Sequence, residues 1–296
     1  MKHNVKKLAT CFAILAAGLY AINVPLSKLL LEHVEPTMMA SFLYLGAGIG
    51  LLLYGLGQKA LGKGQKQEAL TKKELPYTIA MVVLDIAAPI FLMLGIERTN
   101  SANVSLLNNF EIVATSLIAL LIFKEKISRL LWIAIGLVVA ASVILTFEGN
   151  GAFVFNTGSL FVLAASVCWG MENNCTNKIS HKSAVEIVVI KGCFSGLGSL
   201  VVALILGEQL PGLKWMVLVL LLGFVAYGLS INFYIRAQNQ LGAAKTSAFY
   251  SVAPFLGVAF SMALLGERPG LQFYVALSIM IVSTVLMIKD TLREEN

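Results

Sequence analysis

Five ionisable residues stand inside long runs of apolar side chains, where a charge has no water to solvate it. They are Lys28, Asp85, Glu111, Glu172 and Lys191. A charged residue at the centre of a membrane helix costs about 2.5–3.5 kcal/mol on insertion scales. Such residues therefore line solute or proton pathways, or pair with one another, in preference to contacting lipid. Three acids against two lysines favour a cationic solute or a coupled proton.

Glu111 is the principal candidate for a substrate or coupling site. Residues three and four apart share a helical face, so Glu111 is expected beside Asn108 and Thr115, with Ser105 and Asn109 flanking it. A face of amides with one carboxylate in mid-membrane suits a cationic or hydrogen-bonding ligand, or a titrating proton carrier. The alternative is a protonated carboxyl group that is hydrogen-bonded within the helix bundle.

Glu172 is the second candidate, with Trp169, Asn173 and Thr176 at i−3, i+1 and i+4. An aromatic ring beside a carboxylate is a pairing that holds an ammonium group by cation–π attraction and charge. The alternative is a structural ion pair with Lys191, which is expected at similar depth on the next helix. Both interpretations can hold, because an ion pair that opens for substrate is one form of gate.

Asp85 and Lys28 each allow two interpretations. Asp85 lies four residues before Pro89, and a proline inside a helix frees the carbonyl four residues back. Asp85 is therefore either a proton site or a side chain that ties down this kink. Lys28, near the outer end of the first apolar run, either extends to the membrane interface or contacts solute or a counter-ion.

Uncharged candidates come mainly from the second half of the chain. They are Tyr227, Ser230 and Tyr234 on one face of one run, and Ser247, Tyr250, Ser251 and Pro254 on the next. Hydroxyl groups commonly line a cavity, but they also form hydrogen bonds between helices. Tyr227 and Tyr250, together with Asn23 in the first run, complete the set of candidate substrate or coupling residues.

Ten apolar runs of about 18–24 residues must position these side chains. They cover about 8–31, 37–57, 76–97, 101–123, 129–147, 157–180, 184–207, 215–235, 243–265 and 271–289. This length spans a bilayer core as a helix, whereas a membrane β-barrel shows alternation over about ten residues. The spacings of Gly46 with Gly50 and of Gly192 with Gly196 predict close helix packing.

Composition places the chain in a membrane. Hydrophobic residues make up 58% and charged residues 13%, about half of the roughly 25% that is usual in soluble domains. Mean hydropathy is +0.83. The net charge of +6 arises from lysines and arginines in short loops, without a basic, aromatic-rich domain that could bind nucleic acid. The four cysteines fall in apolar runs without a C-x-x-C motif and the three histidines fall in loops, so no metal or cofactor is expected.

Basic residues in the loops predict the orientation. With the N-terminus in the cytoplasm, seventeen lysines and arginines lie inside and three, Arg98, Lys214 and Arg268, lie outside. Positive charge concentrates on the cytoplasmic side of membrane proteins. Both termini are therefore expected in the cytoplasm.

An internal repeat divides the chain into halves at 1–150 and 151–296. Residues 20–27 align with 169–176, and the run 101–123 with its Lys124-Glu125-Lys126 ending resembles the run 243–265 with its Gly266-Glu267-Arg268 ending. Five helices in each half would make the second half insert upside down relative to the first. Inverted repeats are typical of alternating-access carriers with a site near the midplane.

The two halves resemble the paired EamA domains of the drug/metabolite transporter superfamily. The resemblance rests on the segment Tyr20–Lys28, its echo Trp169–Glu172, and the glutamates Glu125 and Glu267 that end the fourth and ninth runs. It implies an all-α, ten-helix inner-membrane carrier that exports metabolites or imports small solutes. Glu111 stands where the second half has Ala253, so the substrate cannot be inferred from the family.

The sequence therefore predicts a secondary transporter of a small polar or cationic metabolite, proton-coupled or exchanging, that works by alternating access. An exporter of neutral or zwitterionic amino-acid-like metabolites is the alternative. No Walker sequence for an ATP-driven pump is present. An enzyme is not expected, because the loops are short and lack histidine pairs, and channels usually have symmetry between subunits rather than within one chain. The expected partners are the solute, the bilayer and protons, for a monomer or homodimer.

Overall fold

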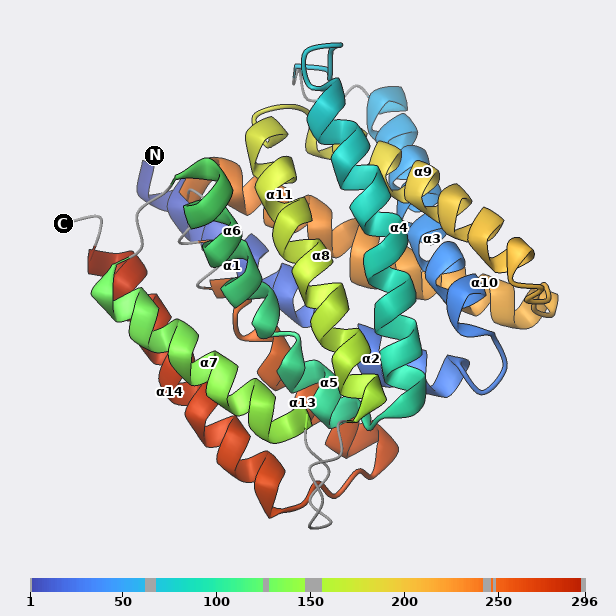
Figure 1. Cartoon of the computed structure of the whole chain (residues 1–296). Helices are drawn as coiled ribbons and strands as arrows, with labels where there is room; N and C mark the ends of the chain where they lie inside the picture. The colour runs from blue at the N-terminus through green and yellow to red at the C-terminus, as the bar shows by residue number, and fades with distance from the viewer. Residues whose placement is uncertain are drawn as a thin grey trace.

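The computed structural model describes residues 2–61, 68–124, 128–146, 156–241, 246 and 249–293. Every regular element in these ranges is a helix, which confirms the predicted all-α class (Figure 1). In chain order the elements are α1 (Lys2–Ala21), α2 (Asn23–Leu30), α3 (Pro36–Ala60), α4 (Leu75–Arg98), α5 (Ser101–Leu107), α6 (Phe110–Phe123), α7 (Arg129–Thr146), α8 (Thr157–Ile179), α9 (Ala184–Ile205), α10 (Leu213–Leu222), the π-helical segment η1 (Gly223–Leu229), α11 (Ser230–Leu241), α13 (Ala253–Leu265) and α14 (Leu271–Arg293).

These helices follow the predicted apolar runs. In the described residues, eight spans are long and apolar enough to cross a membrane, three of them built from consecutive helical segments. The helix α13 is apolar but shorter, and α8 has 23 residues with acid and amide side chains in its C-terminal half. Residues 147, 243–245, 247 and 248 of the predicted runs, and with them the candidate Ser247, lie outside the described residues.

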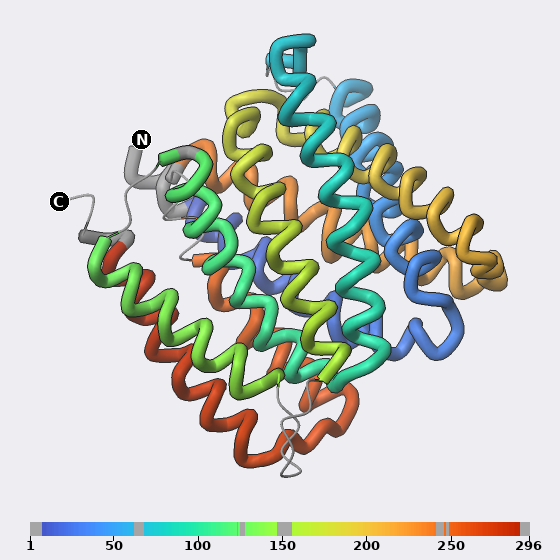
Figure 2. Tube along the Cα trace, in the orientation of Figure 1, coloured from blue at the N-terminus to red at the C-terminus, as the bar shows by residue number. Residues whose placement is uncertain are grey.

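Helices from the first half of the chain pack against helices from the second half. The helix α3 lies along α9, α4 along α8, and α1 along α11. The helices α7 and α14 run side by side as the green and red ribbons of Figure 1, and the tube in Figure 2 shows α4 extending alongside α8. Each of these pairs therefore joins the two halves over much of a helix length.

Glycines allow the closest of these contacts. A Cβ atom added to Gly192 on α9 would lie 2.3 Å from the backbone nitrogen of Gly48 on α3. One added to Gly46 would lie 2.1 Å from the carbonyl oxygen of Leu220 on α10. Backbones approach this closely only where no side chain intervenes. The structure thus confirms the packing role predicted for Gly46 and Gly192, and Gly50 and Gly196 are equally crowded.

Four of the apolar spans are irregular in their middle. The break between α1 and α2 falls at Ile22, and the break between α5 and α6 at Asn108 and Asn109. A π-helical segment separates α10 from α11, and a turn at Ser251 and Val252 precedes α13. Interrupted helices expose backbone polar groups at membrane depth, where they are tolerated when they line a cavity or are buried in protein.

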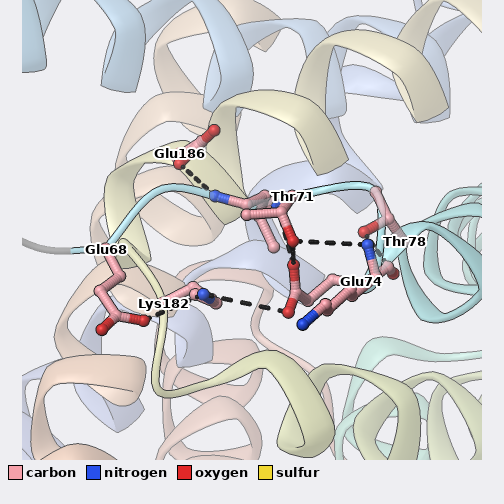
Figure 3. Close-up of polar contacts among 8 residues, drawn as sticks. Glu68, Thr71, Glu74, Thr78, Lys182 and Glu186 are labelled. Atoms are coloured by element: carbon pink, nitrogen blue, oxygen red, sulfur yellow. Dashed lines mark hydrogen bonds and ion pairs between the residues drawn. The ribbon is translucent and has the colours of Figure 1, made fainter.

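A polar clasp ties the segment before α4 to the turn between α8 and α9 (Figure 3). We define it as Glu68, Thr71, Glu74, Lys182 and Glu186. Lys182 Nζ lies 3.0 Å from Glu68 Oε2 and 3.9 Å from Glu74 Oε1. The backbone nitrogen of Thr71 donates to Glu74 Oε2 at 2.7 Å, and that of Leu70 donates to Glu186 Oε2 at 3.0 Å.

These contacts stabilise the ionised carboxyl groups of the clasp. The hydrogen bond from Lys182, followed by its charge, holds the pKa of Glu68 below its ordinary 4.5. Hydrogen bonds from the Thr71 side chain and backbone lower the pKa of Glu74. The clasp therefore joins the two halves of the chain at the end of the bundle where α3, α8 and α11 end.

Candidate functional site

A cavity of about 370 Å³ occupies the level at which the helices are interrupted. It collects side chains from α1, α3, α6, α7, α8, α9, η1, α11, α13 and α14. Seven of the nine residues that the sequence singled out lie in its wall: Asn108, Glu111, Trp169, Glu172, Lys191, Tyr227 and Tyr250. The other two, Asp85 and Asn23, stand directly behind the wall and contact residues that form it.

Glu111 lies in the first turn of α6, just after the break at Asn108 and Asn109. Its side chain is half-buried and faces the cavity. Asn173 Nδ2 on α8 donates to Glu111 Oε1 at 2.6 Å. Asn108 and Thr115, which share its predicted face, also line the cavity. Among the described lysines, arginines and histidines, none forms an ion pair with Glu111.

Asp85, Glu172 and Lys191 form a buried charge triad. Lys191 Nζ lies 3.1 Å from Asp85 Oδ2 and 3.0 Å from Glu172 Oε1. The three residues are only 0%, 2% and 6% exposed, respectively. Thr176 donates a hydrogen bond to Glu172 from the next turn of α8. The ion pair between Glu172 and Lys191 that the sequence offered as an alternative is therefore present.

The triad also changes the interpretation of Asp85. The hydroxyl of Tyr44 on α3 donates to Asp85 Oδ1 at 2.8 Å, while Lys191 on α9 contacts the other oxygen. Asp85 thus contacts neighbouring helices with both of its carboxylate oxygens. Its role as a proton site or at the Pro89 kink stays a prediction.

Five tyrosines form a tyrosine cluster along the cavity: Tyr20, Tyr44, Tyr227, Tyr234 and Tyr250. The ring of Tyr20 has its centroid 5.8 Å from that of Tyr227 and 5.9 Å from that of Tyr250. The rings of Tyr234 and Tyr250 are 5.0 Å apart in a T-shaped arrangement, and those of Tyr44 and Tyr227 are 5.2 Å apart. One aromatic surface therefore extends from α1 and α3 across to α11 and the segment before α13.

Hydrogen bonds fix the inner part of this cluster. Asn23 Nδ2 donates to the Tyr227 hydroxyl at 3.0 Å, and Ser27 Oγ donates to Asn23 Oδ1 at 3.1 Å. Trp169 Nε1 donates to the Tyr44 hydroxyl at 3.3 Å. Asn23 is thus a positioning residue for Tyr227, and Trp169 joins α8 to the charge triad through Tyr44.

The sequence did not single out Tyr20 and Tyr44 as site residues. Tyr20 could have been predicted as a site residue, because it is the first residue of the repeat segment that also contains Asn23. Tyr44 could not have been predicted, since it lies in an apolar, glycine-containing run without acidic or basic residues nearby. Its role depends on Asp85 and Trp169, which approach it from other helices.

The described residues that line the cavity extend to one end of the bundle. Asn177, Gln238 and Asp290, in the last turns of α8, α11 and α14, line it at the end where the clasp lies. Beside the cavity, a much smaller pocket of about 10 Å³ lies among α1, α2, α5 and α13. There α5 and α13 pack so closely that a Cβ atom on Gly257 would lie 2.9 Å from Ser105 Oγ.

Charged side chains hold this other end together by capping helices. Both carboxylate oxygens of Glu267 accept hydrogen bonds of 2.8 Å, from the backbone nitrogens of Ser101 and Ala102 at the start of α5. Glu208 accepts in the same way from the backbone nitrogens of Thr37 and Met38 at the start of α3, at 3.1 and 2.6 Å. Carboxylates at helix N-termini are favourable because free N–H groups and the helix dipole point toward them.

Lys28 caps the C-terminal end of a helix, whereas Glu267 and Glu208 cap N-terminal ends. Its Nζ donates to the carbonyl oxygens of Ile96 at 2.5 Å, Glu97 at 3.2 Å and Thr99 at 2.8 Å, at the end of α4. Lys28 therefore satisfies the last carbonyls of a neighbouring helix, a contact that neither interpretation from the sequence included, and its extension to the membrane interface stays a prediction. Glu125, which the sequence paired with Glu267 as a helix-ending glutamate, lies outside the described residues.

These features define a multi-pass, all-helical membrane protein with a polar cavity that enters from one end of the bundle. Within the described ranges, no group of three or more His, Cys, Asp or Glu side chains is placed to hold a metal ion. The chain belongs to the EamA-like transporter family, whose model matches residues 7–147 and 156–289. The resemblance proposed from the sequence is thereby confirmed.

Relatives of the chain are also described as transporters. An uncharacterized transporter of Methanothermobacter thermautotrophicus is 25% identical over 271 residues, which cover 86% of this chain and 78% of that protein. The uncharacterized inner membrane transporter YedA of Escherichia coli K12 is 24% identical over 264 residues, covering 86% and 82%. One crystal structure superposes with a TM-score of 0.70 at 15% identity, covering 97% of this chain and 98% of the other, and this likeness concerns the fold alone.

Proposed function

We propose that the protein is a secondary transporter that carries a small polar or cationic metabolite across the membrane by alternating access. Glu111 is the principal contact for the solute or for a coupled proton. The observation that carries this proposal is the pairing of the charged residues in the cavity wall: Lys191 is shared by Asp85 and Glu172, whereas Glu111 accepts a hydrogen bond from the neutral amide of Asn173.

An isolated carboxylate in a site of low dielectric constant needs a counter-charge or a proton. A cationic solute supplies the first and protonation the second. Because both neutralise the same group, binding of one displaces the other, and solute movement is then linked to proton movement. With two solutes competing for Glu111, the same site gives exchange.

The two ends of the cavity support alternating access. Lining residues of the cavity extend to the end with the polar clasp, while at the opposite end Glu208, Glu267 and Lys28 cap helix termini. The excess of lysine and arginine on the clasp side assigns this side to the cytoplasm. The inverted repeat and the interrupted helices are the architecture in which carriers bind solute between their halves.

A neutral or zwitterionic amino-acid-like solute is the second candidate. The amides of Asn108, Asn173 and Asn174 line the cavity near Glu111 and can donate and accept hydrogen bonds without a charge. Under this alternative Glu111 would be protonated throughout the cycle. Transport of the solute would then be independent of pH.

The test combines a ligand screen with flux in liposomes. Metabolites that raise the melting temperature of the detergent-purified protein are assayed for uptake into proteoliposomes that contain a pH-sensitive dye. We expect Glu111→Gln to insert and fold but to lose uptake and the accompanying pH change. Glu97→Gln is the matched control, since Glu97 is an exposed glutamate that pairs with Arg98. Wild-type flux by Glu111→Gln would remove Glu111 from the mechanism.

A further inference from the structure

We propose, resting on the transporter function above, that the solute is an organic monocation with a hydrocarbon portion. Its ammonium group is held between the Glu111 carboxylate and the rings of the tyrosine cluster. This assignment rests on the position of the Glu111 carboxylate, which forms no ion pair with the described basic residues, in one cavity with several differently inclined tyrosine rings. The assignment narrows the proposed solute from any small polar or cationic metabolite to organic monocations.

The geometry of the rings suits an ammonium group. Tyr20, Tyr234 and Tyr250 are half-buried and line the cavity together with Glu111. Tyr20 lies edge-on to Tyr227, and Tyr250 lies edge-on to Tyr234, so ring faces and edges point in several directions. A cation within about 6 Å of an aromatic ring centroid is attracted to the ring face.

The charges in the wall favour a cation over an anion or a zwitterion. Three carboxylates line the cavity, from Glu111, Glu172 and Asp290, against one ammonium, from Lys191. Lys191 is already held by Glu172 and by Asp85 behind the wall. A carboxylate on the solute would therefore meet no uncommitted cationic side chain among the described lining residues, and would be repelled by Glu111.

Apolar side chains provide room for the rest of the solute. Ile112, Leu131, Ile231, Ile235 and Met287 line the same cavity, whose volume of about 370 Å³ exceeds what an inorganic ion requires. Apolar surface buried beside a charged anchor contributes favourable free energy in proportion to its area. An alkyl or arylalkyl ammonium compound uses both features of the site.

The test is a charge series on one carbon skeleton, measured by isothermal titration calorimetry on the purified full chain. The probes are phenethylamine as the cation, 2-phenylethanol as the neutral analogue and L-phenylalanine as the zwitterion. We expect phenethylamine to bind at least about tenfold more tightly than the other two, since a charge-assisted contact is about twice as strong as a neutral one. Glu111→Gln should abolish this preference, while Glu97→Gln should keep it.

Two tyrosine variants separate the ring from its hydroxyl group. Tyr250→Leu should weaken phenethylamine binding about three- to tenfold, the size of a partly desolvated cation–π contact, whereas Tyr250→Phe keeps a ring and should bind nearly as well as wild type. Tyr20→Leu repeats the test on α1 if Tyr250→Leu lowers the melting temperature. Equal losses for the Leu and Phe variants at both positions would contradict the ring contact.

The outcomes distinguish this assignment from the transporter function itself. Preferred binding of L-phenylalanine or 2-phenylethanol, or no binding of phenethylamine, overturns the organic-cation class. Glu111-dependent flux of a neutral or zwitterionic metabolite in the liposome assay would at the same time retain the transporter. Absence of flux for every ligand that binds would reject the transporter function, while the ammonium site would remain as a binding site.

Discussion

Replacement of Lys191 by methionine should be among the most destabilising single changes in this protein. Its Nζ lies 3.1 Å from Asp85 Oδ2 and 3.0 Å from Glu172 Oε1, and both acids are at most 2% exposed. At about 3 Å and an effective dielectric constant of about 20, each contact is worth roughly 5 kcal/mol before desolvation. Removal of one member of a buried ion pair typically costs a net 3–5 kcal/mol, about half or less of this sum.

The assay is thermal unfolding in a fixed detergent, followed by tryptophan fluorescence. A loss of about 3–5 kcal/mol corresponds to a melting temperature lower by roughly 6–20 °C on the scale of folded domains of similar size. The matched control is the triple variant Asp85→Asn, Glu172→Gln and Lys191→Met. It removes all three charges and should recover most of the loss, because a fully neutral set leaves no uncompensated buried charge.

Two results would refute this reasoning. If Lys191→Met melts within about 2 °C of wild type, a change below about 1 kcal/mol, the two acids do not depend on the ammonium for their burial. If the triple variant is as unstable as the single variant, the loss comes from packing around residue 191 and not from charge. Either result would also weaken the charge balance that assigns a cation to the cavity.

Three further predictions concern the helix caps, the helix contacts and the clasp. Glu267→Gln removes a charged cap worth about 1 kcal/mol, so amides in the first turn of α5 should exchange with deuterium about fivefold faster, and unchanged exchange would contradict the capping role. Gly192→Ala places a Cβ atom 2.3 Å from a backbone nitrogen of α3 and should cost about 1–3 kcal/mol in thermal unfolding, whereas Gly136→Ala, with open space around it, should be neutral or stabilising. Because the folded pKa of Glu68 is lowered from 4.5, the stability that its contact with Lys182 provides is present above pH 4.5 and is lost as the pH falls through the folded pKa. Amide exchange in the segment before α4, corrected for its intrinsic pH dependence, should rise over that range, and Lys182→Met should raise it already at pH 7.

The sequence predicted the elements well because membrane insertion is decided locally. A run of about twenty apolar residues must form a helix in lipid, since no other partner exists for its backbone groups. The helices α3, α4, α7 and α9 fall within a few residues of the predicted runs. The interruptions at Ile22 and at Asn108 were not predicted, because a short break between two apolar half-helices barely changes hydropathy.

The sequence also identified many of the polar residues that line the cavity. A helix places residues three and four apart on one face, so Glu111, Asn108 and Thr115 could be grouped without knowledge of any other helix. The same rule could not supply the partners of these residues. Asn173 reaches Glu111 from α8, and Tyr44 reaches Asp85 from α3, through the order in which helices pack.

The sequence by itself determined that this chain lies in a membrane and which side chains are costly there, because transfer of a charge into lipid depends on the residue and its immediate run. Only the tertiary structure decided that Lys191 is shared between two acids, that Lys28 caps a helix, and that Glu111 faces the cavity without an ion pair to any described lysine, arginine or histidine. Ion pairing depends on separations of a few ångströms between helices that are distant in the chain. Those separations are set by packing contacts such as the one between Gly48 and Gly192, which hydropathy and helical periodicity do not encode.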